Sequence, residues 1–463
     1  MPIRVTPSVA QATANAAGPK PTELKAAVTP ATTKPAGWAP TAPRRPATLQ
    51  PVTATLSSRP PSQAVEFIAR YDQRLNLTAE NAAGKHDGMR KAPLAFFRAT
   101  PSLFAHDLQG AFSGQARLGE TPAPTTAVLV DPHLGNFGSL RGPGGKAVWG
   151  VNDFDQVAKG SPEVDLERLA SSVVLEARAL GLPPDAQKAL VGQLYATYAD
   201  TVHQVATGKE QGVAYLAAGE LKGAEADLTA KADGTKRKDF LSRYVKDPDN
   251  DLHFKNGGEL RKLQPAEEAT LKQALADYQS RLPAGSSVKQ PLEVLDTASK
   301  LGGGSSYGLP RFLVLVANAE KGKAPILLEL KAAPPSPLVD LTGNPTSFDG
   351  KAVADGQQAL GGRLNPLFGH ASAGRQSLMV RELEPERGSV ALDQLSSKQL
   401  TTLVGDAARV LARAHSADRS TAGKLDGWLK SSAATAPGRL ADFAVVYANQ
   451  TEKDFAAFKA STD

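Results

Sequence analysis

The chain has 463 residues, and 41% of them are hydrophobic, which is enough for a sizeable buried core. The formal net charge of +6 lies entirely within residues 1–65, where seven basic side chains face one acidic side chain, Glu23. The remainder has no net charge and gives no argument for a nucleic-acid partner. Cysteine is absent, which excludes disulfides, thiolate metal sites and cysteine nucleophiles.

Residues 1–63 have the composition of a disordered tail. They contain twelve of the 34 prolines, and their abundant Ala and Thr supply few large apolar groups. The tail is either a plain solubilising extension or an element for secretion or partner docking. No apolar run approaches the ~18 residues of a transmembrane helix, and the N-terminus lacks the apolar stretch of a secretory signal. We therefore expect a cytoplasmic protein with no membrane contact.

Residues 64–290 combine helical and strand patterns and are predicted to form a catalytic-loop and helical region, the main part of a large lobe. Helical spacing of apolar residues and short apolar runs distinguish the two kinds of element. The predicted elements are helices over 64–75 and 163–180 and strands over 126–130 and 146–151. Residues 182–290 are richly charged, and we interpret them as a helical insertion.

Residues 291–390 begin with a glycine cluster and continue with apolar runs typical of a small antiparallel sheet. The predicted elements are strands over 312–316, 326–330 and 378–383 and a helix over 351–360. Residues 391–463 then predict helices over 396–415 and 438–459, which return to the large lobe. The predicted fold class is α+β, in two lobes behind the N-terminal tail.

The first chemical cluster follows the strands over 126–130 and 146–151. Asp131 and Asn136 lie in the loop after the first strand, and Asp153 and Asp155 follow the second. Phosphoryl transfer needs one Asp to accept the hydroxyl proton and an Asn and a second Asp to hold Mg²⁺. We therefore assign Asp131 as the base and Asn136, Asp153 and Asp155 as metal ligands. Any one of them alone is more often a turn former.

Two neighbouring residues have open interpretations. His133 is either a structural histidine or a neutral ring that orients the loop. Asp165 is either a first-turn helix acid stabilised by the helix dipole or a side chain that holds the catalytic loop from beneath.

The second chemical cluster lies in the region 291–390. A glycine-rich loop lets backbone amides approach phosphates, although a hairpin turn is the commoner explanation. Lys331 follows an apolar strand and can reach the α and β phosphates of ATP, unless it is simply solvated. Asp355 on the next helix is a possible ion-pair partner for Lys331. The nucleotide-binding residues assigned here are Gly303, Ser305, Ser306, Gly308, Lys331 and Asp355.

In ordinary kinase-like enzymes the glycine loop and lysine precede the catalytic Asp, whereas here Asp131 and Asp153 come first. Circular permutation explains this order. A string of motifs, taken in their order along the chain, resembles the bacterial domain-of-unknown-function family 2252 between about residues 85 and 460. The motifs are KAPLAFFR (91–98), VLVDPHLGNFG (128–138), VNDFDQVAKGSPEVDLERLAS (151–171), SSYGLPRFLVLV (305–316), LLELKAA (327–333), DGQQAL (355–360), MVREL (379–383), LARAHS (411–416) and YANQTEKDF (447–455).

The family is similar to a permuted relative of the aminoglycoside-phosphotransferase and protein-kinase fold. The resemblance implies Asp131 as catalytic base, Asn136 and Asp153 as metal ligands and Lys331 as the phosphate lysine. Four positions depart from the expected pattern. Val130 stands where the family usually has Gly, and Pro132 stiffens the loop after Asp131. Ser305 replaces the middle glycine of the phosphate loop, and the acid of the small-lobe helix is the shorter Asp355.

The sequence therefore predicts an ATP- and Mg²⁺-dependent phosphotransferase that acts on a hydroxyl-type acceptor, either a small molecule or a protein. One alternative is a pseudokinase-like interaction module that binds nucleotide without transfer. Another is an enzyme that transfers the nucleotidyl group, AMP. The acceptor and the oligomeric state are not readable from the sequence, and nucleic-acid binding is the weakest rival.

Overall fold

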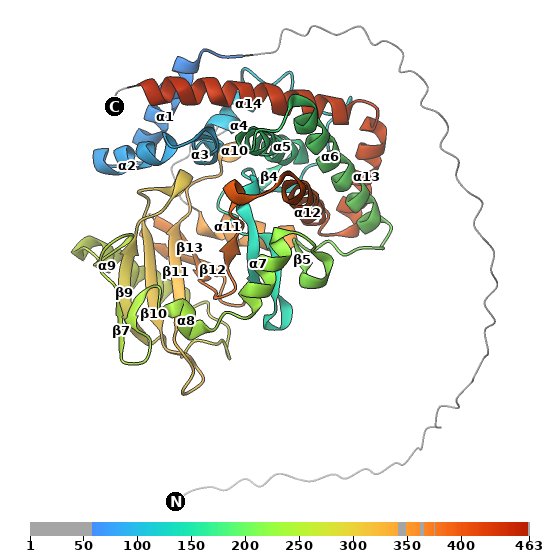
Figure 1. Ribbon diagram of the computed structural model, residues 1–463. Coiled ribbons are helices and arrows are strands. Elements are labelled where there is room, and N and C mark those ends of the chain that lie inside the picture. Colours follow the sequence, from blue (N-terminus) through green and yellow to red (C-terminus); the bar gives the residue numbers. More distant parts are fainter. Residues whose placement is uncertain (1–57, 341–348, 362–364, 375, 462–463) are drawn as a thin grey trace, which may run out of the picture. The chain divides into compact units, whose positions relative to one another are not determined.

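The computed structural model describes residues 58–340, 349–361, 365–374 and 376–461, and it confirms a mixed α+β fold (Figure 1). The predicted tail lies outside the described residues as far as position 57. The helices of the described part are α1 (Pro61–Arg74), α2 (Ala79–Met89), α3 (Pro93–Ala99), α4 (Pro101–Gln109), α5 (Pro162–Ala179), α6 (Pro184–Ala206), α7 (Ala224–Asp233), α8 (Arg237–Leu241), α9 (Pro265–Gln279), α10 (Pro337–Asp340), α11 (Gly350–Gly361), α12 (Ser397–His415), α13 (Arg419–Ser432) and α14 (Ala436–Ala460).

The larger sheet is six-stranded, antiparallel throughout, and ordered β12-β13-β11-β10-β9-β8. Its strands are β8 (Leu260–Arg261), β9 (Val294–Lys300), β10 (Arg311–Val316), β11 (Ile326–Ala332), β12 (Gly369–Ala373) and β13 (Gln376–Glu382). The predicted strands over 312–316, 326–330 and 378–383 and the helix over 351–360 are confirmed as β10, β11, β13 and α11.

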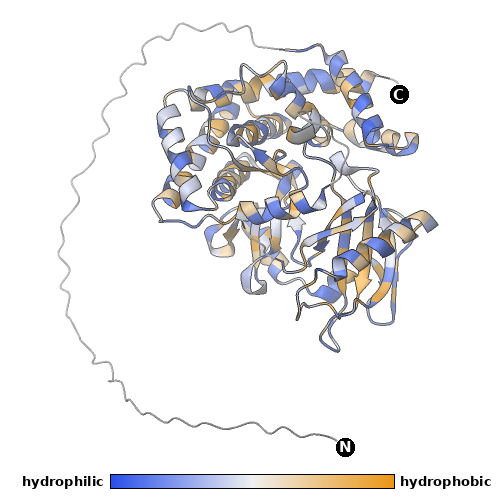
Figure 2. Cartoon of the chain, turned by 180° about the vertical axis from the view of Figure 1, so that it is seen from behind, coloured by the Kyte–Doolittle hydropathy of each residue, from blue (hydrophilic) through white to orange (hydrophobic). Residues whose placement is uncertain are grey.

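Both faces of this sheet are covered. Leu271, Ala274 and Tyr278 of α9 pack on one face, against side chains such as Val314 and Leu328. The opposite face packs against α8 and the hairpin of β6 (Val245–Asp247) and β7 (Asp251–Phe254). Figure 2 shows the hydrophobic residues concentrated on these strands, with hydrophilic residues on the outward sides of the helices.

The second sheet is four-stranded, ordered β14-β2-β3-β5, and lies beside the long helices. Its strands are β2 (Phe137–Arg141), β3 (Ala147–Val151), β5 (Tyr215–Ala217) and β14 (Gly388–Ser389), and a separate pair joins β1 (Thr126–Val128) to β4 (Ala158–Gly160). The largest apolar core joins the sheet to α5, α6, α12 and α14. The helices predicted over 163–180, 396–415 and 438–459 are confirmed as α5, α12 and α14.

Three expectations need correction. Residues 182–290 are not a helical insertion alone, because β5 pairs with β3 and β8 pairs with β9, so the segment contributes to both sheets. The strand predicted over 126–130 ends at Val128, because Val130 has a left-handed φ of 68°. Arg59, assigned to the tail by composition, is only 6% exposed and forms ion pairs with Asp107 and Asp454.

None of the helices in the described residues combines the length and the apolar character that crossing a bilayer requires.

Candidate functional site

One cavity of about 270 Å³ brings the two predicted clusters together. The loops after β1 and β3 form one side of it, and the β9–β10 loop and the end of β11 form the other. Its lining residues are Arg98, Leu129, Asp131, His133, Asn136, Asp153, Asp155, Gln156, Gly303, Gly304, Ser305, Ser306, Arg311, Lys331 and Arg381. Eight of the ten sequence-predicted site residues are in this set, and the two that are not are Gly308 and Asp355.

The loop that carries Asp131 is held from beneath by Asp165, the second of the two readings that the sequence left open. The Asp165 carboxylate accepts hydrogen bonds from the backbone N–H groups of Leu129 (2.6 Å) and Val130 (2.7 Å). Val130 is β-branched and lies in the left-handed region, with a φ of 68°, which is a strained conformation. Such strain persists only where the surrounding contacts impose the conformation. Asp165 provides these contacts and so fixes the direction in which Asp131 leaves the strand.

Asp165 is itself held by a fully buried chain of side chains. His415, the last residue of α12, places Nε2 2.9 Å from Asp165 Oδ2 and Nδ1 2.8 Å from the Tyr198 hydroxyl. Asp165, His415 and Tyr198 are each at most 1% exposed. The chain therefore ties the Asp131 loop to two long helices of the main core, α6 and α12.

The Asp131 carboxylate is held on one side by a buried arginine. Arg168 of α5 donates from Nε to Asp131 Oδ1 at 2.9 Å, stacks on the Phe97 ring and donates to the Phe97 carbonyl. The other oxygen, Oδ2, lies 3.9 Å from His133 Nε2. Burial raises the pKa of Asp131 to about 6, despite the opposing charge of Arg168. Its pKa is therefore close to the range in which a general base works near neutral pH.

Asn136 ends a short 3₁₀ turn over Leu134–Asn136 and folds back on the same loop. Its side-chain amide donates to the Asp131 backbone carbonyl at 2.8 Å. That bond uses the nitrogen of the amide and does not involve Oδ1, and Asn136 lines the cavity. His133, its neighbour, is 3% exposed, and burial holds its pKa well below the usual value, so it is a neutral ring.

Lys331 reaches from β11 to the loop after β3. Its ammonium forms ion pairs with Asp155 and, at 3.7 Å, with Asp153. Burial would raise the pKa of Asp153, but the charge of Lys331, a side-chain hydrogen bond with Asp155 and the charges of two arginines hold it low. Burial and the neighbouring Asp153 charge raise the pKa of Asp155 to about 6. Asp153 is the more accessible of the two, with 32% of its side chain exposed.

A second ion network continues from Lys331 across three strands. Glu329, fully buried on β11, accepts hydrogen bonds from Arg311 Nε (2.7 Å) and Arg381 Nε (2.6 Å). Strand register explains the arrangement, because Arg381 lies opposite Glu329 and Arg311 lies opposite Lys331. The two guanidinium groups satisfy Glu329 and also line the cavity.

The predicted phosphate loop is divided by the structure. Gly303, Ser305 and Ser306 line the cavity around a 3₁₀ turn over Gly304–Ser306, in which Gly304 has a left-handed φ of 57°. Gly308 faces α2 instead, where an added Cβ would lie 2.6 Å from Asn81. Its φ of 79° serves the turn rather than contact with the cavity.

The expected ion pair between Asp355 and Lys331 is wrong. Asp355 lies on the exposed side of α11 and pairs with Lys351, four residues earlier on that helix. Asp355 and Lys351 occupy positions i+4 and i of α11, so their side chains meet on the helix surface and not at the sheet. Lys331 pairs with the loop after β3 instead.

Sequence reasoning missed three arginines and a glutamine at the cavity. Arg311 is the first residue of β10, and Arg381 is the last but one of β13. Their positions depend on strand pairing that spacing alone does not reveal. Arg98 closes the KAPLAFFR motif, which was the available signal. It is exposed and has no ion-pair partner among the described residues. Gln156 donates to the Ser305 hydroxyl at 3.4 Å and joins the two halves of the site.

No three His, Asp or Glu side chains in the described part of the chain are placed to hold a metal ion by themselves. The donor set nevertheless fits Mg²⁺, which keeps several waters and takes one or two carboxylates together with substrate phosphates. Asp153 and Asn136 provide a carboxylate and an amide oxygen at the cavity wall.

The sequence profile of a bacterial family described as an uncharacterized protein conserved in bacteria, domain of unknown function 2252, matches residues 77–461. The chain therefore belongs to this family. No curated protein and no solved structure matches the chain significantly.

Proposed function

We propose that the protein is a Mg²⁺-dependent phosphotransferase that uses ATP as donor and a hydroxyl group as acceptor. The observation that carries the proposal is the convergence of Asp131, Asn136, Asp153 and Lys331 with the Gly303–Ser306 turn around one cavity. Phosphoryl transfer depends mainly on positioning and charge stabilisation, and these residues are of the types it requires.

The topology of the larger sheet supports the proposal. Strands β9, β10 and β11 form a consecutive antiparallel run, with the glycine-containing turn between the first two and Lys331 on the third. Protein kinases likewise place a glycine-rich loop over the phosphates and a lysine on the third strand. In this chain the elements come after Asp131 and Asp153, as a circular permutation requires.

The proposed roles follow from the contacts. Asp131 accepts the proton of the acceptor hydroxyl at Oδ2, the oxygen that Arg168 leaves unpaired. Lys331 and the Gly303–Ser306 amides bind phosphate oxygens, and Arg98 adds a cation that forms no ion pair within the described residues. Asp153 and Asn136 would hold Mg²⁺, which neutralises phosphate charge.

The direct test is calorimetric titration of ATP into the full chain with and without Mg²⁺. We expect binding that depends on Mg²⁺, and a loss of that dependence in Asp153→Asn. The matched control is Asp442→Asn, which should leave binding unchanged. Asp442 is an exposed acid on α14 whose one ion-pair partner among the described residues is Lys188. Absence of nucleotide binding under every metal condition would refute the proposal.

One observation favours the alternative of a nucleotide-binding module without transfer. Asp131 is tied to the fully buried Arg168, and the strained Val130 precedes it where the family usually has Gly. Incubation with ATP labelled at the γ or α phosphate separates the possibilities. Label transferred or released from the γ position indicates phosphotransfer, label from the α position on an acceptor indicates AMP transfer, and binding without either indicates the module.

A further inference from the structure

The cavity is unusual for a nucleotide site because it is almost entirely polar. Of its fifteen described lining residues only Leu129 has a large apolar side chain, and Leu129 is 3% exposed. Four cationic side chains and three carboxylates surround it instead. Small-molecule pockets are commonly lined by apolar and aromatic groups, and nucleobases bind by stacking on them. The described walls fit a phosphate chain with its metal. They contain no Phe, Tyr or Trp, and the one aromatic ring among them, His133, is only 3% exposed.

The sheet face that continues from Lys331 is also unavailable. Alternate residues of a strand share a face, so Lys331, Glu329 and Leu327 lie in succession on one side of β11. Leu313 lies opposite Glu329, and Leu315 lies opposite Leu327. A base attached to phosphates at Lys331 would rest on this face, over Glu329 or Leu327. Successive side chains on one face of a strand are about 7 Å apart.

This face is filled by the chain itself. Leu313, Leu315 and Leu327 are all 0% exposed, because side chains of α8, β6 and β7 pack on them. The covering residues are Phe240, Leu241, Val245 and Phe254. Figure 1 shows α8 and β7 against β9 and β10, and the Phe254 backbone N–H donates to Asp296 of β9 at 2.6 Å. A base could reach the face only by displacing this packed segment.

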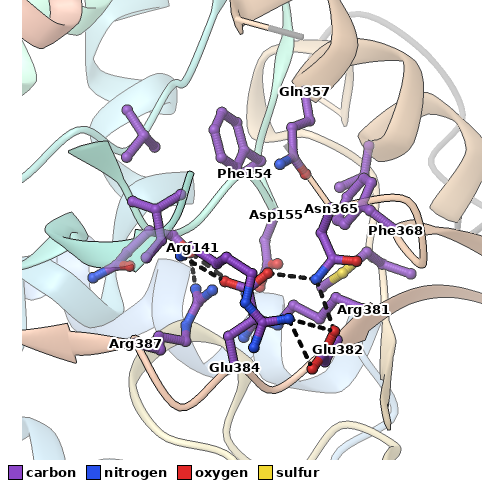
Figure 3. Close-up of a pocket in the computed structure, with 15 residues that line it drawn as sticks. Arg141, Phe154, Asp155, Gln357, Asn365, Phe368, Arg381, Glu382, Glu384 and Arg387 are labelled. Atoms are coloured by element: carbon purple, nitrogen blue, oxygen red, sulfur yellow. Dashed lines mark hydrogen bonds and ion pairs between the residues drawn. The ribbon is translucent and has the colours of Figure 1, made fainter. Parts of the chain in front are cut away.

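The neighbouring cavity does not offer a slot either. It lies behind Asp155 and Arg381, which border both spaces, and Phe154 and Phe368 provide aromatic walls (Figure 3). Its volume is about 40 Å³, which by the ~10–15 Å³ needed per water holds a few water molecules. Asn365 closes it with hydrogen bonds to Glu382 and Glu384, as the dashed lines of Figure 3 show.

From these three observations we infer that the site recognises its donor through the Mg²⁺-bound triphosphate chain and not through the base. The inference rests on the proposed function and narrows its donor class. ATP, GTP and inorganic tripolyphosphate share the recognised group, and the base of a nucleotide remains outside the described cavity. The donor is then selected by the number and charge of its phosphates, because these set the strength of its interaction with Lys331, Arg98 and the other cationic side chains of the cavity.

The test compares the three ligands by calorimetry on the full chain in excess Mg²⁺. Recognition through phosphates predicts dissociation constants within about tenfold of one another, a difference of about 1.4 kcal/mol or less. The inference is overturned if ATP binds more than about tenfold tighter than GTP, or if either nucleotide binds more than about tenfold tighter than tripolyphosphate. Either result leaves the proposed function standing. If none of the three binds, the proposed function itself fails.

Two variants show whether tripolyphosphate binds in this cavity rather than on the basic residues 1–65. Lys331→Met and Arg98→Ala should each weaken tripolyphosphate binding, the first by at least about tenfold. Arg98 has no ion-pair partner among the described residues, so Arg98→Ala remains informative if Lys331→Met fails to fold. Tripolyphosphate binding that both variants leave unchanged would place the ligand elsewhere and overturn the inference.

Discussion

Two buried clusters of charge in this protein resemble each other in composition but differ in how completely they are paired. In the first, the Arg59 cluster, Arg59 lies between Asp107 and Asp454, with Tyr447 and Gln450 beside them. Every carboxylate oxygen of the two acids accepts a hydrogen bond. In the second, the Lys331 cluster, Lys331 faces Asp153 and Asp155 at the edge of a cavity.

The comparison shows which property of a buried charge indicates a functional site. Burial is common to both clusters, and each has one cation between two acids. Only the Lys331 cluster borders open space with a partly exposed carboxylate, Asp153, that keeps room for another ligand. The Arg59 cluster instead joins the start of the described chain to α4 and α14 and leaves no room. Incomplete pairing beside a cavity, rather than buried charge itself, separates a site from a structural lock.

The largest expected effect is the loss of the Arg59 cation. Arg59→Met keeps most of the side-chain volume but leaves Asp107 and Asp454 buried without a counter-charge, so the free energy of unfolding should fall by about 3–5 kcal/mol. Denaturant titration measures it. Arg70→Met, an exposed arginine on α1, is the control and should change stability by less than about 0.5 kcal/mol. Equal effects of the two substitutions would show that the cluster is no lock.

The next effect is the pH dependence caused by Asp131. Its folded pKa of about 6 lies above the ordinary 3.8, so the stabilising contribution of the protonated carboxyl is complete below pH 3.8 and is lost as the pH rises through about 6. By linkage the loss is of the order of 3 kcal/mol. The difference in unfolding free energy between wild type and Asp131→Asn should therefore move in favour of the variant between pH 4 and pH 7. A pH-independent difference would contradict the raised pKa.

A smaller effect on stability is expected when one acid of the Lys331 cluster is neutralised. Burial and the Asp153 charge make an ionised Asp155 unfavourable, so Asp155→Asn should leave the unfolding free energy unchanged or raise it by about 1 kcal/mol. Mg²⁺-dependent ATP binding should weaken in the same variant. In the Arg59 cluster the corresponding change, Asp107→Asn, should destabilise the protein. If both substitutions destabilise equally, the Lys331 cluster is structural as well.

The sequence predicts the elements whose side chains are patterned and misses those formed mainly by pairing. Apolar periodicity marks α5, α12 and α14, and apolar runs mark β3, β10 and β11. By contrast β12 reads GHASA and has no such pattern, because its place depends on pairing with β13. The site follows the same rule. Asp131, Asp153 and Lys331 stand at strand ends that spacing reveals, whereas Arg311 and Arg381 reach the cavity through sheet register.

The smallest expected effect comes from the residue that spacing placed wrongly. The Asp355 side chain is 65% exposed, and within the described part of the chain it pairs only with Lys351, so Asp355→Ala should cost at most about 0.5 kcal/mol of stability. Nucleotide affinity should stay at the wild-type value, because the partners of Lys331 are Asp155 and Asp153. Calorimetry should compare the Mg²⁺–ATP affinity of this variant with that of Asp155→Asn, because each substitution removes one negative charge. A tenfold loss of Mg²⁺–ATP affinity in Asp355→Ala would mean that α11 turns toward the cavity when ligand binds.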